Sequence, residues 1–310
     1  MPNFERPIIV PKGTVFEQYR ELTPQEEAGL ASAESKPAKR ADTRLSGAMK
    51  EQLDRARDLF GADFLGSEVV ENVWGVRLEA KDIPPILFSP EELKRAKELN
   101  QQLVLRVDKA PDGSPLTMQK MNELAQPKMT QGNQGKLLYK VDWYASEEFY
   151  TTETPEAQWA LVSKEVVPGS LGKNYLEQTE GIVAYLQDEV FKGMPIPKEY
   201  QDAIREFESK KASLASLIDS NWQEAAKQLS ELAINQLTRP TPAEALYDLP
   251  TNLLTNNDRH LESTYTWTNR RYSDGKLVYV GGADSGGAYV YAGKPDYRYD
   301  YLGVSFSRRA

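Results

Sequence analysis

The chain has no cysteine and a single histidine, His260, among its 310 residues. Without cysteine there can be no disulfide, thiolate nucleophile, cysteine-ligated zinc or iron–sulfur cluster. A Ser–His–Asp triad would have to use His260, and no Gly-x-Ser-x-Gly motif is present to supply the serine. A lone histidine without such partners is more typical of a structural residue than of a general base or metal ligand. We therefore predict no catalytic residue, no metal site and no cofactor.

Clustered positive charge and long apolar runs are also lacking. There are 46 acidic and 38 basic residues, a formal net charge of −8, which argues against binding to nucleic acid or to an anionic membrane. Near the N-terminus the apolar run is only Ile8, Ile9 and Val10, too short for a signal peptide or a membrane span. We expect synthesis in the cytoplasm and no membrane insertion. The final location stays open, and display on a virion or a cell surface is compatible with the sequence.

What is present is typical of a soluble globular protein. The hydrophobic fraction is 40% and the charged fraction 27%, and a chain of this length can bury roughly three quarters of its unfolded surface. We predict an N-terminal extension at 1–60, partly flexible, with a short strand and a helix fragment followed by a linker before residue 46. Residues 61–134 are predicted as a small α/β portion packed on a main domain at 135–310.

Periodicity and capping residues predict the order strands, helices, strands. Ser89, followed by Pro90, is expected to open a helix. Pro240 and Pro242 are expected to end a long helical segment. The predicted helices are 46–60, one from 90, one from 116, those within 174–237, and a short one after 241. The predicted strands are 102–107, 135–144, 155–167 and those of the C-terminal block.

The C-terminal block, from residue 263, reads as short strands joined by Gly-rich turns. The strands are expected at 263–268, 276–280, 288–291 and 302–308, with Asp274-Gly275 as a hairpin turn. Alternation directs five apolar side chains inward and Ser305 and Ser307 outward. The inward residues are Val278, Val280, Val290, Val304 and Phe306.

This block is unusually rich in tyrosine, with eight of the 16 tyrosines in the final 48 residues. Tyrosine supplies large amphipathic area at low entropy cost, and glycine and serine let loops adapt, as in antibody binding sites. Composition alone favours a recognition surface and an ordinary solvated edge sheet about equally. The predicted ligand-binding residues are Arg271, Tyr272, Tyr279, Ala283, Asp284, Tyr289, Tyr291, Ala292, Tyr297, Arg298, Tyr299 and Tyr301.

Other patterns in the chain point to weaker alternatives. The loop "GGADSGG" lacks the lysine and the helix that a phosphate-binding loop requires, and "DKAPDGS" lacks the spacing of a calcium loop. Asp296 and Asp300 are expected to be solvated rather than to hold an ion. The interleaved Arg and Tyr of "RRYSD" and "YRYDY" could stack on nucleic acid, but the neighbouring aspartates argue against it.

The segments "ALVSKEVVPGSLGKNYLEQT", "PAEALYD", "NNDRHLESTYTWTNRRYSDGKLVYVG" and "YLGVSFSRR" resemble the variable proteins of diversity-generating retroelements of viruses and of small-genome bacteria and archaea. The resemblance is strongest over 157–175 and 240–310. It implies a C-type lectin-like domain at 135–310, with a mixed or antiparallel sheet flanked by the helices of 174–237. It also implies a variable region at about 263–310 and non-catalytic binding of a protein or other macromolecular ligand. The ligand and the oligomeric state are left open.

The family diversifies only at adenines, mostly in asparagine codons, which cannot then yield Glu, Gln, Met, Trp or Lys. From Asn269 to Ala310 there is no Glu, Gln, Met or Trp, and lysine occurs only at Lys276 and Lys294. The same fold family contains formylglycine-generating enzymes, which depend on cysteine, and lectins with a calcium motif that is missing here. An enzyme-derived protein with lost or altered activity is the alternative. Buried polar groups in a deep pocket would favour the enzyme, and a shallow aromatic surface would favour binding.

Overall fold

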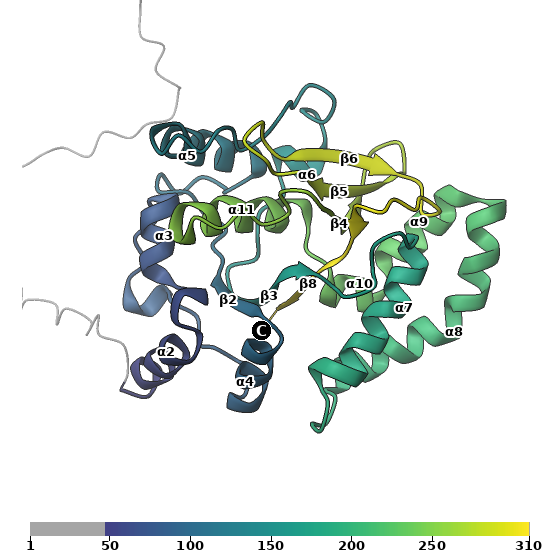
Figure 1. Cartoon of the computed structure of the whole chain (residues 1–310), viewed down its shortest axis with the longest axis horizontal. Coiled ribbons are helices and arrows are strands. Elements are labelled where there is room, and N and C mark those ends of the chain that lie inside the picture. Colours follow the sequence, from purple (N-terminus) through teal and green to yellow (C-terminus); the bar gives the residue numbers. More distant parts are fainter. Residues whose placement is uncertain (1–46, 310) are drawn as a thin grey trace, which may run out of the picture. The chain divides into compact units, whose positions relative to one another are not determined.

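Two four-stranded sheets organise the fold, which is α+β as predicted (Figure 1). The computed structural model describes residues 47–309, so the short strand and the helix fragment predicted before residue 46 lie outside the described residues. The first sheet has the order β1-β2-β3-β8 and the second β6-β5-β4-β7. The strands are β1 (Phe64–Leu65), β2 (Gln101–Leu105), β3 (Trp159–Val166), β4 (Tyr265–Arg271), β5 (Leu277–Gly281), β6 (Tyr289–Gly293), β7 (Leu302–Gly303) and β8 (Ser305–Arg309).

The first sheet joins strands from both ends of the predicted main domain. β3 and β8 pair antiparallel, with Ala160 opposite Arg309. On its other side β3 pairs antiparallel with β2, and β1 runs parallel to β2. The boundary predicted at residue 134 therefore separates β1 and β2 from β3 and β8, although all four strands belong to one sheet.

The single strand predicted at 302–308 is split between the two sheets. β7 pairs parallel with β4 in the second sheet, and β8 pairs with β3 in the first. The prediction that Ser305 and Ser307 face solvent is wrong, because both are buried. Ser307 Oγ accepts a hydrogen bond from Arg106 Nη2 at 3.1 Å, so the polar side of β8 contacts a buried arginine instead of water.

Helices connect the strands, and the one that follows Ser89 begins at the predicted cap. Ser89 forms a capping box with Glu92, and Thr241 forms one with Glu244. The helix predicted as short after Thr241 continues through Pro250 to Asn256. The helices are α2 (Gly47–Phe60), α3 (Ser67–Trp74), α4 (Pro90–Glu98), α5 (Met118–Gln131), α6 (Glu148–Thr151), α7 (Tyr175–Tyr185), α8 (Lys198–Ser220), α9 (Trp222–Glu231), α10 (Ala233–Thr238) and α11 (Pro242–Asn256), with the short turns η1 (Gly61–Asp63), η2 (Ala80–Asp82) and π-helical η3 (Leu186–Val190). Within 47–309, none of these helices has both the length and the apolar composition needed to cross a membrane.

The second sheet lies between two hydrophobic cores. Val278, Val280 and Val290 belong to the core that α3, α5 and α11 share with the first sheet. The opposite face carries Trp267 and Leu277 into the core formed with α7 to α10, the group of helices beside α8 in Figure 1. The predicted inward phase of the valines is therefore confirmed, and their alternation leaves the tyrosines of β5 and β6 on the other face.

The strand predicted at 135–144 does not form. Only Leu138 makes a bridge, parallel to Ala288, and the chain then turns away. Backbone hydrogen bonds nonetheless hold this segment against the loop before β6: Ala288 N donates to Leu137 O at 2.8 Å and Tyr139 N donates to Ala288 O at 3.0 Å. The segment therefore extends the edge of the second sheet as a loop.

Candidate functional site

Nine aromatic rings form a continuous cluster on one face of the second sheet. Cross-strand pairing sets their positions: Tyr279 lies opposite Tyr291, and Gly281 lies between Tyr265 and Tyr289. Ring centroids of neighbouring members are 4.4–6.5 Å apart, the range in which aromatic pairs attract one another. We call this cluster the aromatic surface; its members are Tyr139, Trp143, Tyr265, Tyr279, Tyr289, Tyr291, Tyr297, Tyr299 and Tyr301.

Tyr265 joins the two halves of the aromatic surface. Its ring lies 5.3 Å from Tyr301, which stacks on Tyr299 at 5.1 Å in the loop after β6. It also lies 6.5 Å from both Tyr289 and Tyr291 on β6. The long loop and the sheet therefore present their rings together.

Glycine at two positions makes room for these rings. A Cβ on Gly293 would lie 2.8 Å from both the Trp267 and the Tyr297 rings, closer than real Cβ contacts allow. Gly282 has a φ of +57°, and a Cβ there would meet the Tyr265 ring. The abundance of glycine in this block thus serves close packing of aromatic side chains as well as turns.

Exposure of large apolar side chains is concentrated at the aromatic surface. In the described part of the chain these exposed side chains are Leu87, Tyr139, Trp143, Leu171 and Tyr301. Three of the five belong to the aromatic surface, with exposures of 36%, 41% and 44% for Tyr139, Trp143 and Tyr301. Single exposed apolar residues are ordinary, but a contiguous group of them marks an interaction site.

The predicted site residues differ in how accessible they are. Asp284, Arg298 and Tyr301 are exposed. Those that are half-buried are Arg271, Tyr272, Tyr289, Tyr291, Ala292, Tyr297 and Tyr299. The tyrosines from 289 to 301 gather as expected, although Tyr301 is exposed and the others are half-buried. Tyr272 lies apart from them, because its ring packs edge-on against Phe149 at 5.2 Å beside the first core.

Two predicted residues, Tyr279 and Ala283, are buried, so their expected exposure is wrong. Tyr279 lies on β5 between two other strands, and the ring of Trp267 approaches it to 5.0 Å. Ala283 N donates to Leu261 O at 2.9 Å, which draws the residue into the first core. Tyr279 therefore supports the rings above it, and Ala283 anchors the loop before β6.

Sequence reasoning missed three members of the aromatic surface: Tyr139, Trp143 and Tyr265. Tyr265 lies two positions before Trp267 on β4 and therefore shares its face, and this alternation was the available signal. Tyr139 and Trp143 were assigned to a strand that does not form. They reach the surface because Trp143 Nε1 donates to Val290 O at 3.0 Å and the Tyr139 ring lies 4.4 Å from Tyr289.

The aromatic surface is neutral, and charged groups border it. Burial is the main cause that raises the pKa of Tyr265, to about 12, so its phenol remains a hydrogen-bond donor at neutral pH. Arg298 pairs with Glu177. Lys140 Nζ lies 5.5 Å from the centre of the Tyr139 ring, within cation–π range.

His260 is buried beside Asp258, with Nε2 3.3 Å from the carboxylate. Burial lowers the pKa of His260, which keeps the imidazole neutral at neutral pH. Among residues 47–309 there is no group of three or more His, Asp or Glu side chains able to hold a metal ion.

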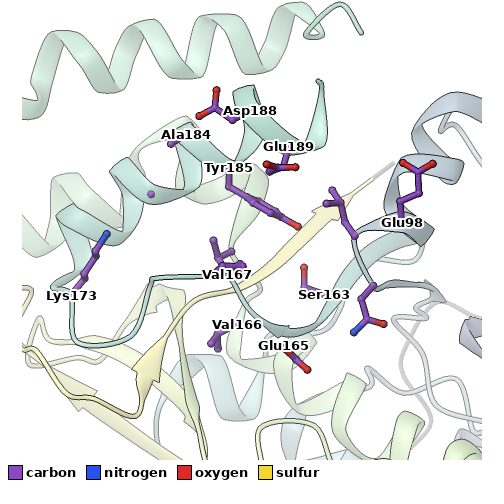
Figure 2. A pocket seen from close by; sticks show the side chains of 14 residues that line it. Glu98, Ser163, Glu165, Val166, Val167, Lys173, Ala184, Tyr185, Asp188 and Glu189 are labelled. Carbon is purple, nitrogen blue, oxygen red and sulfur yellow. The ribbon is translucent and has the colours of Figure 1, made fainter. Parts of the chain in front are cut away.

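A separate cleft of about 650 Å³ lies between α7 with η3 and the end of β3 (Figure 2). Its lining includes the acidic residues Glu98, Glu165, Asp188 and Glu189 and one basic residue, Lys173. Tyr185 forms one wall and packs on Phe306 at 5.4 Å. None of the predicted site residues lines this cleft.

Comparison of the chain with protein-family models, with curated proteins and with solved structures finds no match.

Proposed function

We propose that the protein is a non-catalytic binding protein that recognises a protein ligand through the aromatic surface. The observation that carries this is the concentration of exposed aromatic side chains there: Tyr139, Trp143 and Tyr301 lie in one contiguous cluster. Tyrosine and tryptophan dominate the energetics of protein interfaces because they combine large apolar area with a polar tip.

We further propose that this is the variable protein of a diversity-generating retroelement with a C-type lectin-like domain. Seven of the nine rings come from the predicted variable region at about 263–310. The pairing of β3 with β8 also supports the proposal, because it joins segments from the two ends of the predicted domain. Trp267 and Phe306 are fully buried beneath the aromatic surface. Loops can change in such an arrangement while the core stays the same.

The enzyme alternative is less well supported. The buried polar groups around Arg106 are ion-paired to one another, and the space beside Asp248 measures only about 20 Å³. That is room for about one water molecule rather than a substrate. The aromatic surface, in contrast, is open to a macromolecule.

Sequencing the DNA that flanks the gene tests diversification. We expect a reverse transcriptase gene and a near-copy of the bases encoding about 263–310, differing only where the copy has adenine. A flank with a reverse transcriptase but no near-copy, or differences at all four bases, would refute the proposal of diversification and leave the binding surface to be tested separately.

Selection of random peptides displayed on phage tests binding. Peptides enriched on the wild-type chain should bind Tyr289→Ala/Tyr291→Ala about 30-fold or more weakly, because both rings are central in the aromatic surface. Affinities are measured by titration calorimetry, and thermal melting verifies that the variant is folded.

The matched control is Leu87→Ala, which removes a side chain that is 69% exposed outside the aromatic surface. It should leave peptide affinity within about twofold, since scattered exposed apolar residues contribute little. Failure to enrich any peptide, or equal losses in both variants, would contradict the proposal. Tight binding of single-stranded oligonucleotides at physiological salt would instead assign the rings to base stacking.

A further inference from the structure

Beside the aromatic surface the chain forms a second cleft, of about 720 Å³, between α5 and the loop 133–142. Tyr139 lines this cleft and its ring also packs against that of Tyr289, so the cleft and the aromatic surface share one ring. Most of the other lining residues are polar or charged, among them Asn122, Lys136, Lys140 and Asp142.

The cleft is held firmly against the C-terminal block. Lys136 N donates to Ser285 O at 3.1 Å. A Cβ on Gly287 would lie 2.5 Å from the Leu138 carbonyl carbon, and Gly135 approaches Ser285 even more closely. Both glycines have positive φ, so larger residues there would be strained as well as crowded. The Gln126 side chain holds the loop to α5: its Nε2 donates to Gly135 O at 3.0 Å, and its Oε1 accepts from Leu137 N at 2.9 Å.

Two lysines in the cleft have no anionic partner in the part of the chain that the structure describes. Lys136 and Lys140 are exposed, and neither ammonium group makes an ion pair or a hydrogen bond there; Lys140 only faces the Tyr139 ring. Among residues 47–309, Asp142 is the one carboxylate that lines the cleft. Asp284, in the adjoining loop, accepts a hydrogen bond from Gly286 N at 2.7 Å. The lining carries two lysines against one carboxylate, a small positive excess in a chain with a formal net charge of −8.

We propose that this cleft is an anionic subsite of the ligand-binding surface, which receives an Asp or Glu side chain of the protein ligand while neighbouring residues of that ligand pack on the rings. The proposal rests on the proposed function, because it needs a ligand on the aromatic surface. Lys136, Lys140 and Asn122 line the cleft, each can donate a hydrogen bond to a carboxylate, and Tyr139 supplies an apolar wall. A nucleic acid fits less well, since two lysines beside Asp142 and Asp284 supply little positive charge for a phosphate backbone.

The subsite lies outside the predicted variable region, whereas most of the aromatic surface lies inside it. Lys136, Tyr139 and Lys140 would therefore stay constant while the rings of β6 and the following loop change. Ligands of differently diversified copies would then share an acidic residue at the same place.

The test uses peptides selected from a random phage-displayed library on the full-length wild-type chain. We expect the enriched peptides to be acidic and to bind Lys136→Glu/Lys140→Glu about tenfold or more weakly. Their affinity for the wild-type chain should fall as salt rises, and this salt dependence should be weaker for the variant.

The matched control is Lys94→Glu/Lys192→Glu, which changes the net charge equally at two exposed lysines that make no ion pair among residues 47–309. It should weaken binding less than about twofold, since distant surface charges are screened. Peptides that need Tyr289 and Tyr291 but bind the Lys136→Glu/Lys140→Glu variant normally would overturn the subsite and leave the proposed function standing. Peptides indifferent to both sets of substitutions would overturn both proposals. If a fluorescent single-stranded oligonucleotide binds the wild-type chain and loses affinity for this variant, the cleft holds phosphate and the proposal is wrong.

Discussion

Replacing Arg106 by methionine should destabilise the protein by about 3–5 kcal/mol, measured by urea denaturation. The guanidinium is fully buried between β2, α11 and β8. Nη1 lies 3.2 Å from Glu244 Oε1, and Nη2 lies 2.6 Å from Asp248 Oδ2. Arg309 still pairs with Glu244 at 2.6 Å, so the substitution mainly leaves Asp248 as a buried charge without a counter-ion.

A matched control shows what an arginine contributes when it is exposed. Arg77 has a side chain that is 84% exposed and lies 3.3 Å from Glu71. Arg77→Met should change the free energy of unfolding by less than about 1 kcal/mol. Equal losses at Arg77 and Arg106 would contradict the importance of burial.

The pH dependence of the free energy of unfolding, compared between the wild-type protein and Arg106→Met, gives a second measure of the role of Arg106. Burial raises the pKa of Asp248 above its ordinary value, and without Arg106 it should rise further. A carboxyl group whose pKa is raised in the folded state stabilises that state at low pH, and this contribution to stability is lost as pH rises. The deficit of Arg106→Met should therefore be largest at neutral pH and shrink toward about pH 4.5. A deficit that stays constant over this range would rule out an uncompensated Asp248 charge as its cause.

In the wild-type chain the pKa of Glu244 is shifted in the opposite direction to that of Asp248. Burial alone would raise its pKa, but Arg106 and Arg309 overcome that effect and lower it to about 2. A depressed folded-state pKa contributes stability above the unfolded-state value and loses it as pH falls toward the folded-state value. Acid should thus destabilise the wild-type chain between about pH 4.5 and pH 2, partly through this residue.

Trp267→Ala should destabilise the protein by about 3–5 kcal/mol, because it empties a large volume that the neighbouring elements cannot fill. The side chain is fully buried, 5.0 Å from Tyr279 and 5.6 Å from Tyr175 between ring centroids. Its indole Nε1 has no hydrogen-bond acceptor among the described residues, so the loss is one of packing. Phe306→Ala, which removes a fully buried ring from β8, should cost a similar amount.

The control variant removes a ring from the aromatic surface instead of from the core. Tyr301 is 44% exposed, and Tyr301→Ala should change the free energy of unfolding by about 0.5 kcal/mol or less. Urea denaturation of the three variants compares them directly. If Tyr301→Ala were as damaging as Trp267→Ala, the division between a fixed scaffold and a tolerant surface would be wrong.

Local signals in the sequence predicted the α+β class and most elements. Ser89 caps its helix as expected, because a cap depends on residues only three positions away. Alternation placed Val278, Val280 and Val290 in the core for the same reason, since neighbouring side chains of a strand point to opposite faces. The tyrosine-rich composition of the C-terminal block pointed to the candidate site.

Tertiary structure decided which residues share that site and which are buried. The segment around Tyr139 joins the aromatic surface through hydrogen bonds to Ala288, about 150 positions away in sequence, and no periodicity encodes such a pairing. Tyr279 is buried because β5 has a strand on each side, which alternation along one strand does not reveal. Ser307 is buried, and its hydroxyl accepts a hydrogen bond from the buried Arg106 guanidinium. Sequence determines the face that a side chain takes; the packing of distant elements determines whether that face meets water.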